Sequence, residues 1–399
     1  MKKSVLLGTL AAAALVAGAA GATTLDDVKA RGVLNCGSNT GLTGFGAPDA
    51  DGNYQGFDVD VCKALAAAAL VAGAAGAGTL DDIKARGELI CGSNTGLTGF
   101  GAPDASNTWT GFDVDLCKAI GAAVLGDASK VKFVPTTGET RFTALASGEV
   151  DLLVRNSTWT FSRDNDLKLD FVAVNYYDGQ GFMVKKDLGV SSAKELDGAT
   201  VCIQTGTTTE LNLADFFKSN GITYTPVTVA DDSEAQRQYE AGACDAFTTD
   251  ASGLAATRAT MADPTAHVIL PEIISKEPLG PVVRHGDNNW GDIVRWTYFA
   301  LVIAEEKGIT KANLEEVIAK SEADPASDPE TKRLLGIGDN DTGKMMGLDK
   351  DWARRAIAVS GNYGEIFEAN IGASTPIGLA RGLNALWTQG GLQYAPPVR

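Results

Sequence analysis

Residues 11–65 of this 399-residue chain recur as residues 66–120, and this internal repeat limits what the chain can fold into. The two copies are identical at 44 of 55 positions, and the run from Cys36 to Ala50 returns unchanged from Cys91 to Ala105. Solenoids and other stacked architectures need three or more units. Because there are two copies, we interpret the repeat as a tandem duplication of the 5′ coding region.

The repeated unit contains part of a segment that is typical of export signals. Lys2 and Lys3 precede an apolar run from Val5 to Ala20, and Ala20-Gly21-Ala22 is a small-residue cleavage site. We expect residues 1–22 to be a signal peptide rather than a membrane anchor, because the run is short for a membrane span. Ala66–Ala77 repeats the end of this segment, so a second cut after Ala77 is a further hypothesis.

The charge balance excludes several classes of function. The chain has 34 basic and 50 acidic residues and a net charge of −16, which argues against a nucleic-acid partner because that affinity rests on Lys and Arg. Two histidines, His267 and His285, do not supply a His-rich zinc site. Asp339-Asn340-Asp341 lacks the full calcium-loop pattern and is interpreted as a turn. We expect no metal or cofactor.

Strand and helix patterns alternate along the chain beyond the repeat. Predicted strands are 88–91, 131–134, 150–154, 199–204, 224–229 and 244–248, and predicted helices are 114–124, 141–148, 209–219, 233–241 and 292–307. This alternation predicts an α/β protein with mostly parallel sheets and helices on both faces. Ligands of such sheets bind at the carboxyl ends of the strands.

The loops at those strand ends share one chemistry. Residues 156–164 carry hydroxyls, an aromatic side chain and Arg163, whose guanidinium suits a carboxylate. Residues 204–210 form a Thr-rich turn before a helix, where backbone N–H groups hold anions, and Asp250 could accept an ammonium group. Each feature also has an ordinary interpretation: a surface pair of Arg163 with Asp164, an N-cap at the Thr-rich turn, and an N-cap at Asp250.

Eight motifs, in this order, carry a resemblance to a known family. They are GFDVDL (111–116), RFTALASGEVDLL (141–153), NSTWTFSRD (156–164), NYYDGQGFMV (175–184), QTGTTTELNL (204–213), CDAFTTD (244–250), LPEIISKEPLGP (270–281) and RGLNALWTQGGLQYAPPVR (381–399). From about residue 79 to residue 399 the chain resembles the periplasmic general L-amino-acid-binding proteins of ABC transporters, in solute-binding protein family 3. The family carries one copy of the first strand, loop and helix, not two.

The resemblance implies a two-lobed, type II periplasmic-binding-protein fold. Lobe 1 would comprise residues 79–180 and 281–399, the latter with a C-terminal helical extension, and lobe 2 would comprise residues 183–276. Two hinge segments are expected near residues 177–183 and 276–282. Residues 23–78 would be a spare copy with an Ala-rich linker. The implied protein is a periplasmic monomer that closes on its ligand and delivers it to a membrane permease.

The resemblance also implies which residues bind the amino acid. Arg163 would pair with the α-carboxylate, helped by Thr158 and, from the opposite lobe, by Thr207 and Thr208. Asp250 and the backbone carbonyl of Asn156 would take the α-ammonium. The side chain of the ligand would face three residues of the first loop, Asn94, Leu97 and Phe100. The neutral amide of Asn94 fits broad selection among side chains.

The repeat reduces the fifteen pairings that six cysteines allow. Cys36 with Cys62 and Cys91 with Cys117 are equivalent pairs, and Cys202 would then join Cys244, although free thiols and exchange between copies stay open. Lobe 1 has one slot for the repeated piece. We favour the second copy because it runs directly into the next strand, although Asn39 and Phe45 of the first copy could substitute.

Two other function classes remain open at this point. A dehydratase-like enzyme on the same fold would need a general acid in the cleft, for which Glu139 and Glu210 are the nearby candidates. An extracytoplasmic amino-acid sensor is the third possibility, although no receptor transmembrane segment supports it.

Overall fold

The computed structural model describes residues 34–37, 42, 44–49, 53–68 and 78–399. The expected signal peptide, the cleavage site after Ala77 and Asn39 lie outside the described residues. The chain divides into two compact units, residues 1–77 and 78–399, and each is described by itself.

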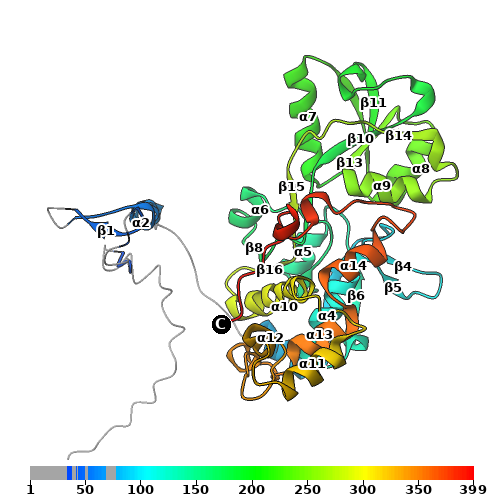
Figure 1. Cartoon of the computed structure of the whole chain (residues 1–399). Helices are drawn as coiled ribbons and strands as arrows, with labels where there is room; N and C mark the ends of the chain where they lie inside the picture. The colour runs from blue at the N-terminus through cyan, green and yellow to red at the C-terminus, as the bar shows by residue number, and fades with distance from the viewer. Residues whose placement is uncertain (1–33, 38–41, 43, 50–52, 69–77) are drawn as a thin grey trace, which may run out of the picture. The chain divides into compact units, whose positions relative to one another are not determined.

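The larger unit has two lobes, each built on a five-stranded sheet (Figure 1). The sheet of lobe 1 has the order β6 (Val131–Pro135), β3 (Leu89–Ser93), β7 (Leu152–Leu153), β16 (Val282–Arg284) and β8 (Leu169–Phe171). The first three strands are parallel, and β16 runs antiparallel to both of its neighbours. A short hairpin of β4 (Ala102–Pro103) and β5 (Trp109–Thr110) follows β3.

Helices cover both faces of this sheet. On one face, α4 (Phe112–Leu125) and α10 (Asn288–Glu306) pack into the main core, and on the other α5 (Arg141–Ala146) packs into a separate cluster. Helix α10 begins where the Asp287 side chain accepts a hydrogen bond from the backbone N–H of Trp290. The remaining α-helices of lobe 1 are α3 (Thr79–Arg86), α6 (Phe161–Asn165), α11 (Leu314–Ala323), α12 (Pro329–Leu334), α13 (Trp352–Ser360) and α14 (Tyr363–Asn370).

Lobe 2 repeats this arrangement. Its sheet has the order β12 (Tyr224–Val229), β11 (Ala199–Gln204), β13 (Ala246–Asp250), β10 (Gln180–Lys185) and β14 (His267–Ile269), of which the first three strands are parallel. Helix α7 (Thr208–Asn220) packs on one face, and α8 (Asp232–Glu240) and α9 (Ala251–Thr260) pack on the other. The predicted α/β architecture with helices on both faces of each sheet is therefore confirmed.

Two short strands connect the lobes. Strand β9 (Tyr176–Asp178) pairs antiparallel with β15 (Glu277–Leu279), and the ribbon belongs to neither five-stranded sheet. The chain passes from β9 into β10 of lobe 2 and returns through β15 into β16 of lobe 1. These strands lie within or next to the segments expected to form the hinge.

The second copy of the repeat supplies β3 and α4 of lobe 1. Gly121, the first residue after the second copy, continues α4, and a Cβ there would lie 2.2 Å from Cγ2 of Val131. Ala66 stands at the equivalent position, directly after the first copy. Placing the first copy in lobe 1 would therefore force the neighbouring side chain to move.

The smaller unit contains β1 (Ala47–Pro48), β2 (Tyr54–Gln55) and α2 (Phe57–Ala68). It leaves exposed the side chains whose equivalents form the core of lobe 1. Phe57 is 65% exposed, whereas its counterpart Phe112 is 2% exposed, and Phe45 is 50% exposed, whereas Phe100 is 1% exposed. Among its described residues, the first copy thus has a similar apolar pattern without a comparable core around Phe45 and Phe57.

Three disulfides join the six cysteines in the expected pairs. Cys36 is bonded to Cys62, Cys91 to Cys117, and Cys202 to Cys244. The second of these ties β3 to α4, and the third ties β11 to the residues that lead into β13. Each disulfide is local to one copy of the repeat or to one lobe.

Candidate functional site

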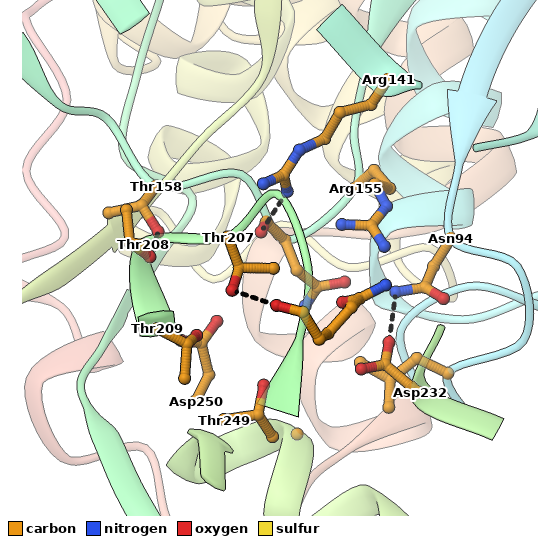
Figure 2. Close-up of a pocket in the computed structure, with 14 residues that line it drawn as sticks. Asn94, Arg141, Arg155, Thr158, Thr207, Thr208, Thr209, Asp232, Thr249 and Asp250 are labelled. Carbon is orange, nitrogen blue, oxygen red and sulfur yellow. Dashed lines mark hydrogen bonds between the residues drawn. The ribbon is translucent and has the colours of Figure 1, made fainter. Parts of the chain in front are cut away.

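A pocket between the two lobes is lined by residues from both sheets (Figure 2). Lobe 1 contributes Asn94, Leu97, Arg141, Arg155, Asn156 and Thr158, and lobe 2 contributes Gln204, Thr207, Thr208, Thr209, Asp232, Thr249, Asp250 and Gly253. Most of these residues follow the carboxyl ends of parallel strands, which is where the sequence placed a ligand site.

The start of helix α7 forms one wall of the pocket. Gly206 makes the turn after β11 with a φ of 71°, a conformation that favours glycine. The Thr207 hydroxyl donates to the carbonyl of Gln204 at 2.8 Å, which fixes the turn. The backbone N–H groups of the first turn of α7 thereby lie beside the pocket, where an anion is favoured.

Asp250 forms an acidic part of the pocket on the same side, beside Thr209 of α7 (Figure 2). The half-buried Asp250 lies at the start of α9, but it does not cap that helix by a side-chain hydrogen bond. Burial, together with the nearby carboxylates of Asp178 and Glu277, raises the pKa of Asp250 well above its usual range. A cation in the pocket would relieve both effects, so this carboxylate is a suitable acceptor for an ammonium group.

Two buried arginines point into the pocket from the side of lobe 1, opposite Thr249 and Asp250 (Figure 2). Arg141 donates to the carbonyls of Asn156 and Gly206 and to the Ser157 hydroxyl, all at 3.3–3.4 Å. The Nε of Arg141 and one terminal nitrogen, Nη2, of Arg155 have no hydrogen-bond partner within the described part of the chain.

Neither guanidinium has a carboxylate within ion-pair distance among the described residues. Burial lowers the pKa of Arg141, and the positive charges of Arg155 and Arg163 lower it further. Burial also lowers the pKa of Arg155. Arginine stays protonated in proteins, so the folded protein buries two positive charges at a cost in free energy. An anionic ligand would offset this cost.

Asn94 and Asp232 meet across the pocket. The Asn94 amide donates to the Asp232 carboxylate at 3.2 Å, which joins the first loop of lobe 1 to the start of α8 in lobe 2. The Asn94 side-chain oxygen accepts from the backbone N–H of Gly96 at 3.2 Å. The amide is thus oriented by its own loop toward the other lobe.

Glu277 holds the two threonine hydroxyls that were expected to bind a carboxylate. It accepts hydrogen bonds from Thr158 of lobe 1 at 2.5 Å and from Thr208 of lobe 2 at 3.0 Å. Arg163 lies behind them, where its Nη1 donates to the carbonyl of Thr158 at 2.9 Å. Burial lowers the pKa of Arg163 to about 10, although the charges of Glu277 and Asp250 oppose the shift.

The structure places seven of the nine expected ligand residues around the pocket: Asn94, Leu97, Asn156, Thr158, Thr207, Thr208 and Asp250. Arg163 and Phe100 are not among the residues that line it. Phe100 is buried in the core of lobe 1 against Phe112 and Tyr176. The carbonyl of Asn156, expected to take the ammonium, accepts from Arg141.

The sequence did not single out Arg141, Arg155 or Asp232 as ligand residues. Arg155 directly follows the predicted strand 150–154 and precedes the polar loop of residues 156–164, so its position carried a signal. Arg141 and Asp232 each begin a helix, which is an ordinary place for a charged surface residue. Each of them bonds a residue of the opposite lobe, Arg141 the carbonyl of Gly206 and Asp232 the amide of Asn94.

The described residues contain no group of three or more His, Cys, Asp or Glu side chains arranged to hold a metal ion. In the same part of the chain, no helix combines the length and the apolar character that crossing a membrane requires.

Residues 89–326 match the sequence profile of the bacterial extracellular solute-binding proteins, family 3. The chain belongs to this family. The match begins at β3 and covers both lobes as far as the residues after α11. The smaller unit and the last part of lobe 1 lie outside the match.

Named relatives extend this similarity to the C-terminal part. The glutamate/glutamine/aspartate/asparagine-binding protein BztA of Rhodobacter capsulatus is 74% identical over 335 residues, which cover 84% of this chain and 97% of that protein. The general L-amino acid-binding periplasmic protein AapJ of Rhizobium johnstonii is 57% identical over 339 residues, which cover 84% of this chain and 98% of that protein.

A solved structure agrees in fold. The ABC transporter periplasmic binding protein from Brucella ovis with glutathione bound is 55% identical, with a TM-score of 0.78, covering 81% of this chain and all of that chain. The family member described here is therefore a solute-binding protein of the amino-acid ABC transporter type. Because its close relatives are binding proteins, the dehydratase-like enzyme is set aside.

Proposed function

We propose that this protein captures L-amino acids in the periplasm, with preference for acidic and amide side chains, and delivers them as a monomer to an ABC permease. The observation that carries the preference is the pair of buried arginines, Arg141 and Arg155, which face the pocket without carboxylate partners among the described residues. The names of the relatives BztA and AapJ support an amino-acid ligand.

In this proposal the pocket is divided by charge. Asp250 receives the α-ammonium group, and the backbone N–H groups at the start of α7 face the α-carboxylate beside Thr158. Arg163 supports that carboxylate site through Thr158, whose carbonyl it holds. Arg141 and Arg155 then receive the oxygen atoms of the ligand's side chain, since both carboxylates and amide carbonyls accept hydrogen bonds from guanidinium groups.

The proposed ligand contacts come from both lobes, and binding would therefore close the lobes on the ligand. The ammonium acceptor lies in lobe 2 and both arginines lie in lobe 1, so a ligand contacts all three only when the lobes are together. Binding therefore favours the closed state by the difference in affinity between the two states. The permease would recognise the closed form.

Isothermal titration calorimetry with the mature protein tests the proposal. Glutamate, glutamine, aspartate and asparagine should bind tightest among the L-amino acids, and the D-enantiomers should bind far more weakly because the three polar contacts fix the chirality. Preferred binding of apolar or basic amino acids would contradict the role given to the arginines. Mass spectrometry of the exported protein tests the localisation, with Thr23 as the expected first residue and Gly78 as the result of the second cut.

A γ-glutamyl peptide is a second candidate ligand, favoured by the relative that is solved with glutathione bound. Such a peptide presents the same α-ammonium and α-carboxylate groups as glutamate. Competition between glutathione and glutamate in the same calorimeter separates the two candidates. A dissociation constant for glutathione below that for glutamate would make the peptide the primary ligand.

A further inference from the structure

The ribbon that connects the lobes has two edges, and lobe 1 covers the first with main chain. On the β15 edge, the backbone N–H of Trp159 donates to the carbonyl of Pro278 at 2.8 Å. On the same edge, the N–H of Gly280 donates to the carbonyl of Ser157 at 3.1 Å. The returning strand is therefore attached to lobe 1 as part of an extended backbone ladder.

The β9 edge is covered instead by one side chain from the far end of the sequence. The backbone N–H of Tyr177 donates to Oδ1 of Asn384 at 2.7 Å, and Nδ2 of Asn384 donates to the carbonyl of Tyr177 at 3.0 Å. A single amide thus makes both bonds that a neighbouring strand would make. Asn384 is 3% exposed, so water does not compete for these bonds.

Asn175, two residues before Tyr177, is also held by side chains from the C-terminal part of the chain. The carbonyl of Asn175 accepts from the Tyr363 hydroxyl at 2.9 Å and from the Gln393 amide at 3.4 Å. Both donors are buried. Three side chains between residues 363 and 393 therefore fix the backbone of the outgoing connection.

The loop that carries Asn384 is itself fixed to the core of lobe 1. Arg381 forms two hydrogen bonds with the Glu305 carboxylate of α10, at 2.9 and 3.1 Å, and donates to the carbonyl of Asn384. The Trp387 indole donates to Glu306 of the same helix at 3.0 Å. A continuous chain of contacts runs from α10 through Arg381 and Asn384 to Tyr177.

Attachment to lobe 2 begins within two residues of Tyr177. The carbonyl of Gly179 accepts from the N–H of Ala251, at the start of α9, at 2.8 Å. The Asp178 carboxylate accepts from the N–H of Ser252 at 3.4 Å. Tyr177 of the outgoing connection is thus fixed to lobe 1, and Gly179 is fixed to lobe 2. The backbone that can change conformation between these two points is limited to the bonds around Asp178. In Figure 1 the red C-terminal segment lies beside these connecting strands.

We propose that Asn384 is a positioning residue for ligand binding: it fixes Tyr177 to lobe 1 and thereby sets the angle at which the two walls of the pocket meet. The residue lies beyond position 326, where the family match ends, so it belongs to an addition to the shared domain. The inference rests on the proposed function, because the angle matters for affinity only if the ligand is bound between closed lobes.

Two substitutions of Asn384 test this role. Asn384→Ala removes both bonds to Tyr177, whereas Asn384→Asp keeps the acceptor for the Tyr177 N–H and loses the donor. The readouts are glutamate affinity by calorimetry and the distance between spin labels on two exposed residues of different lobes, Glu149 and Lys218. We expect Asn384→Ala to broaden the ligand-free distance distribution and weaken affinity by about tenfold, with Asn384→Asp in between.

Asn313→Ala is the matched control. Asn313 is a half-buried asparagine of lobe 1 whose amide, like that of Asn384, bonds two backbone groups: Oδ1 accepts from the N–H of Thr310 at 2.7 Å, and Nδ2 donates to the carbonyl of Gly308 at 2.9 Å, in the loop between α10 and α11. Its loss should lower the melting temperature without changing the distance distribution or the affinity. If Asn384→Ala behaves in the same way as this control, Asn384 is merely structural and the inference is wrong.

The outcomes separate this inference from the proposed function. Should the wild-type protein bind no amino acid, the proposed function fails, yet the ligand-free distance distributions still test whether Asn384 restrains the lobes. If Asn384→Ala does not fold, Asn384→Asp alone decides, because it keeps the shape of the side chain. An unchanged distribution and affinity in Asn384→Asp would then overturn the inference.

Discussion

Replacing Arg141 by methionine should weaken ligand binding while leaving the ligand-free protein as stable as before, or more stable. Arg141 is a buried cation whose three hydrogen bonds are long and whose Nε has no partner in the described part of the chain. Burying an unpaired ion costs several kcal/mol even after relaxation. Methionine keeps much of the apolar volume and removes the charge.

The size of each effect follows from these contacts. Three weak hydrogen bonds, at roughly 1 kcal/mol each, offset most of that desolvation cost, so Arg141→Met should change the free energy of unfolding by between zero and about +1 kcal/mol. This corresponds to a rise in melting temperature of up to about 2 °C. A charged hydrogen bond to the ligand contributes about 1.5–3 kcal/mol, so the affinity for glutamate should fall by roughly 10- to 100-fold.

Calorimetry with glutamate and thermal unfolding of the ligand-free protein measure the two effects. Arg284→Met is the control, because Arg284 donates to the carbonyls of Leu145 and Val150 within lobe 1 and does not line the pocket. It should lower stability and leave affinity unchanged. If Arg141→Met shows the control's pattern instead, Arg141 has a structural role and the reasoning about the pocket is refuted.

Three further predictions follow from single residues. Asp250→Asn should weaken every amino-acid ligand by about tenfold or more in calorimetry, because it removes the charged acceptor of the ammonium group that all ligands share; selective loss of one side-chain class would contradict this role. Burial raises the pKa of Asp113 to about 7, so the folded protein retains a proton that the unfolded chain releases near pH 4. The free energy of unfolding should therefore fall as pH rises from about 4 to 7, and denaturant titrations of Asp113→Asn should show a flatter dependence. Gly121→Ala should destabilise lobe 1 by about 1–3 kcal/mol in denaturant unfolding, because the added Cβ would meet Val131 at 2.2 Å; an unchanged midpoint would show that the site has room.

The polar groups at the strand ends of lobe 2 were predictable because they are local. Residues 199–204 and 224–229 form strands with the predicted bounds, and the Thr-rich turn and Asp250 follow directly from strand ends. Chain order alone places such groups at one edge of a parallel sheet. The N-cap interpretation of Asp250 was wrong, since its carboxylate makes no capping hydrogen bond.

The remaining features depend on contacts between distant parts of the sequence. Phe100 belongs to the core because its loop folds back, with the N–H of Phe112 donating to the carbonyl of Gly99. Arg141 is buried, and one of its hydrogen bonds goes to the carbonyl of Gly206 in the other lobe. Asn384 bonds a residue 207 positions away, and neither hydrophobic periodicity nor local turn chemistry reports such a contact.

Gly121 also matters for which copy of the repeat enters lobe 1 while the chain is being synthesised. Synthesis runs from the N-terminus, so the first copy of the repeated segment is complete before the second copy exists. A chain that accepted the earliest available strand and helix would build lobe 1 from the wrong piece. Since Ala66 continues the first copy where Gly121 continues the second, steric fit against Val131 would favour the second copy, although it is made later.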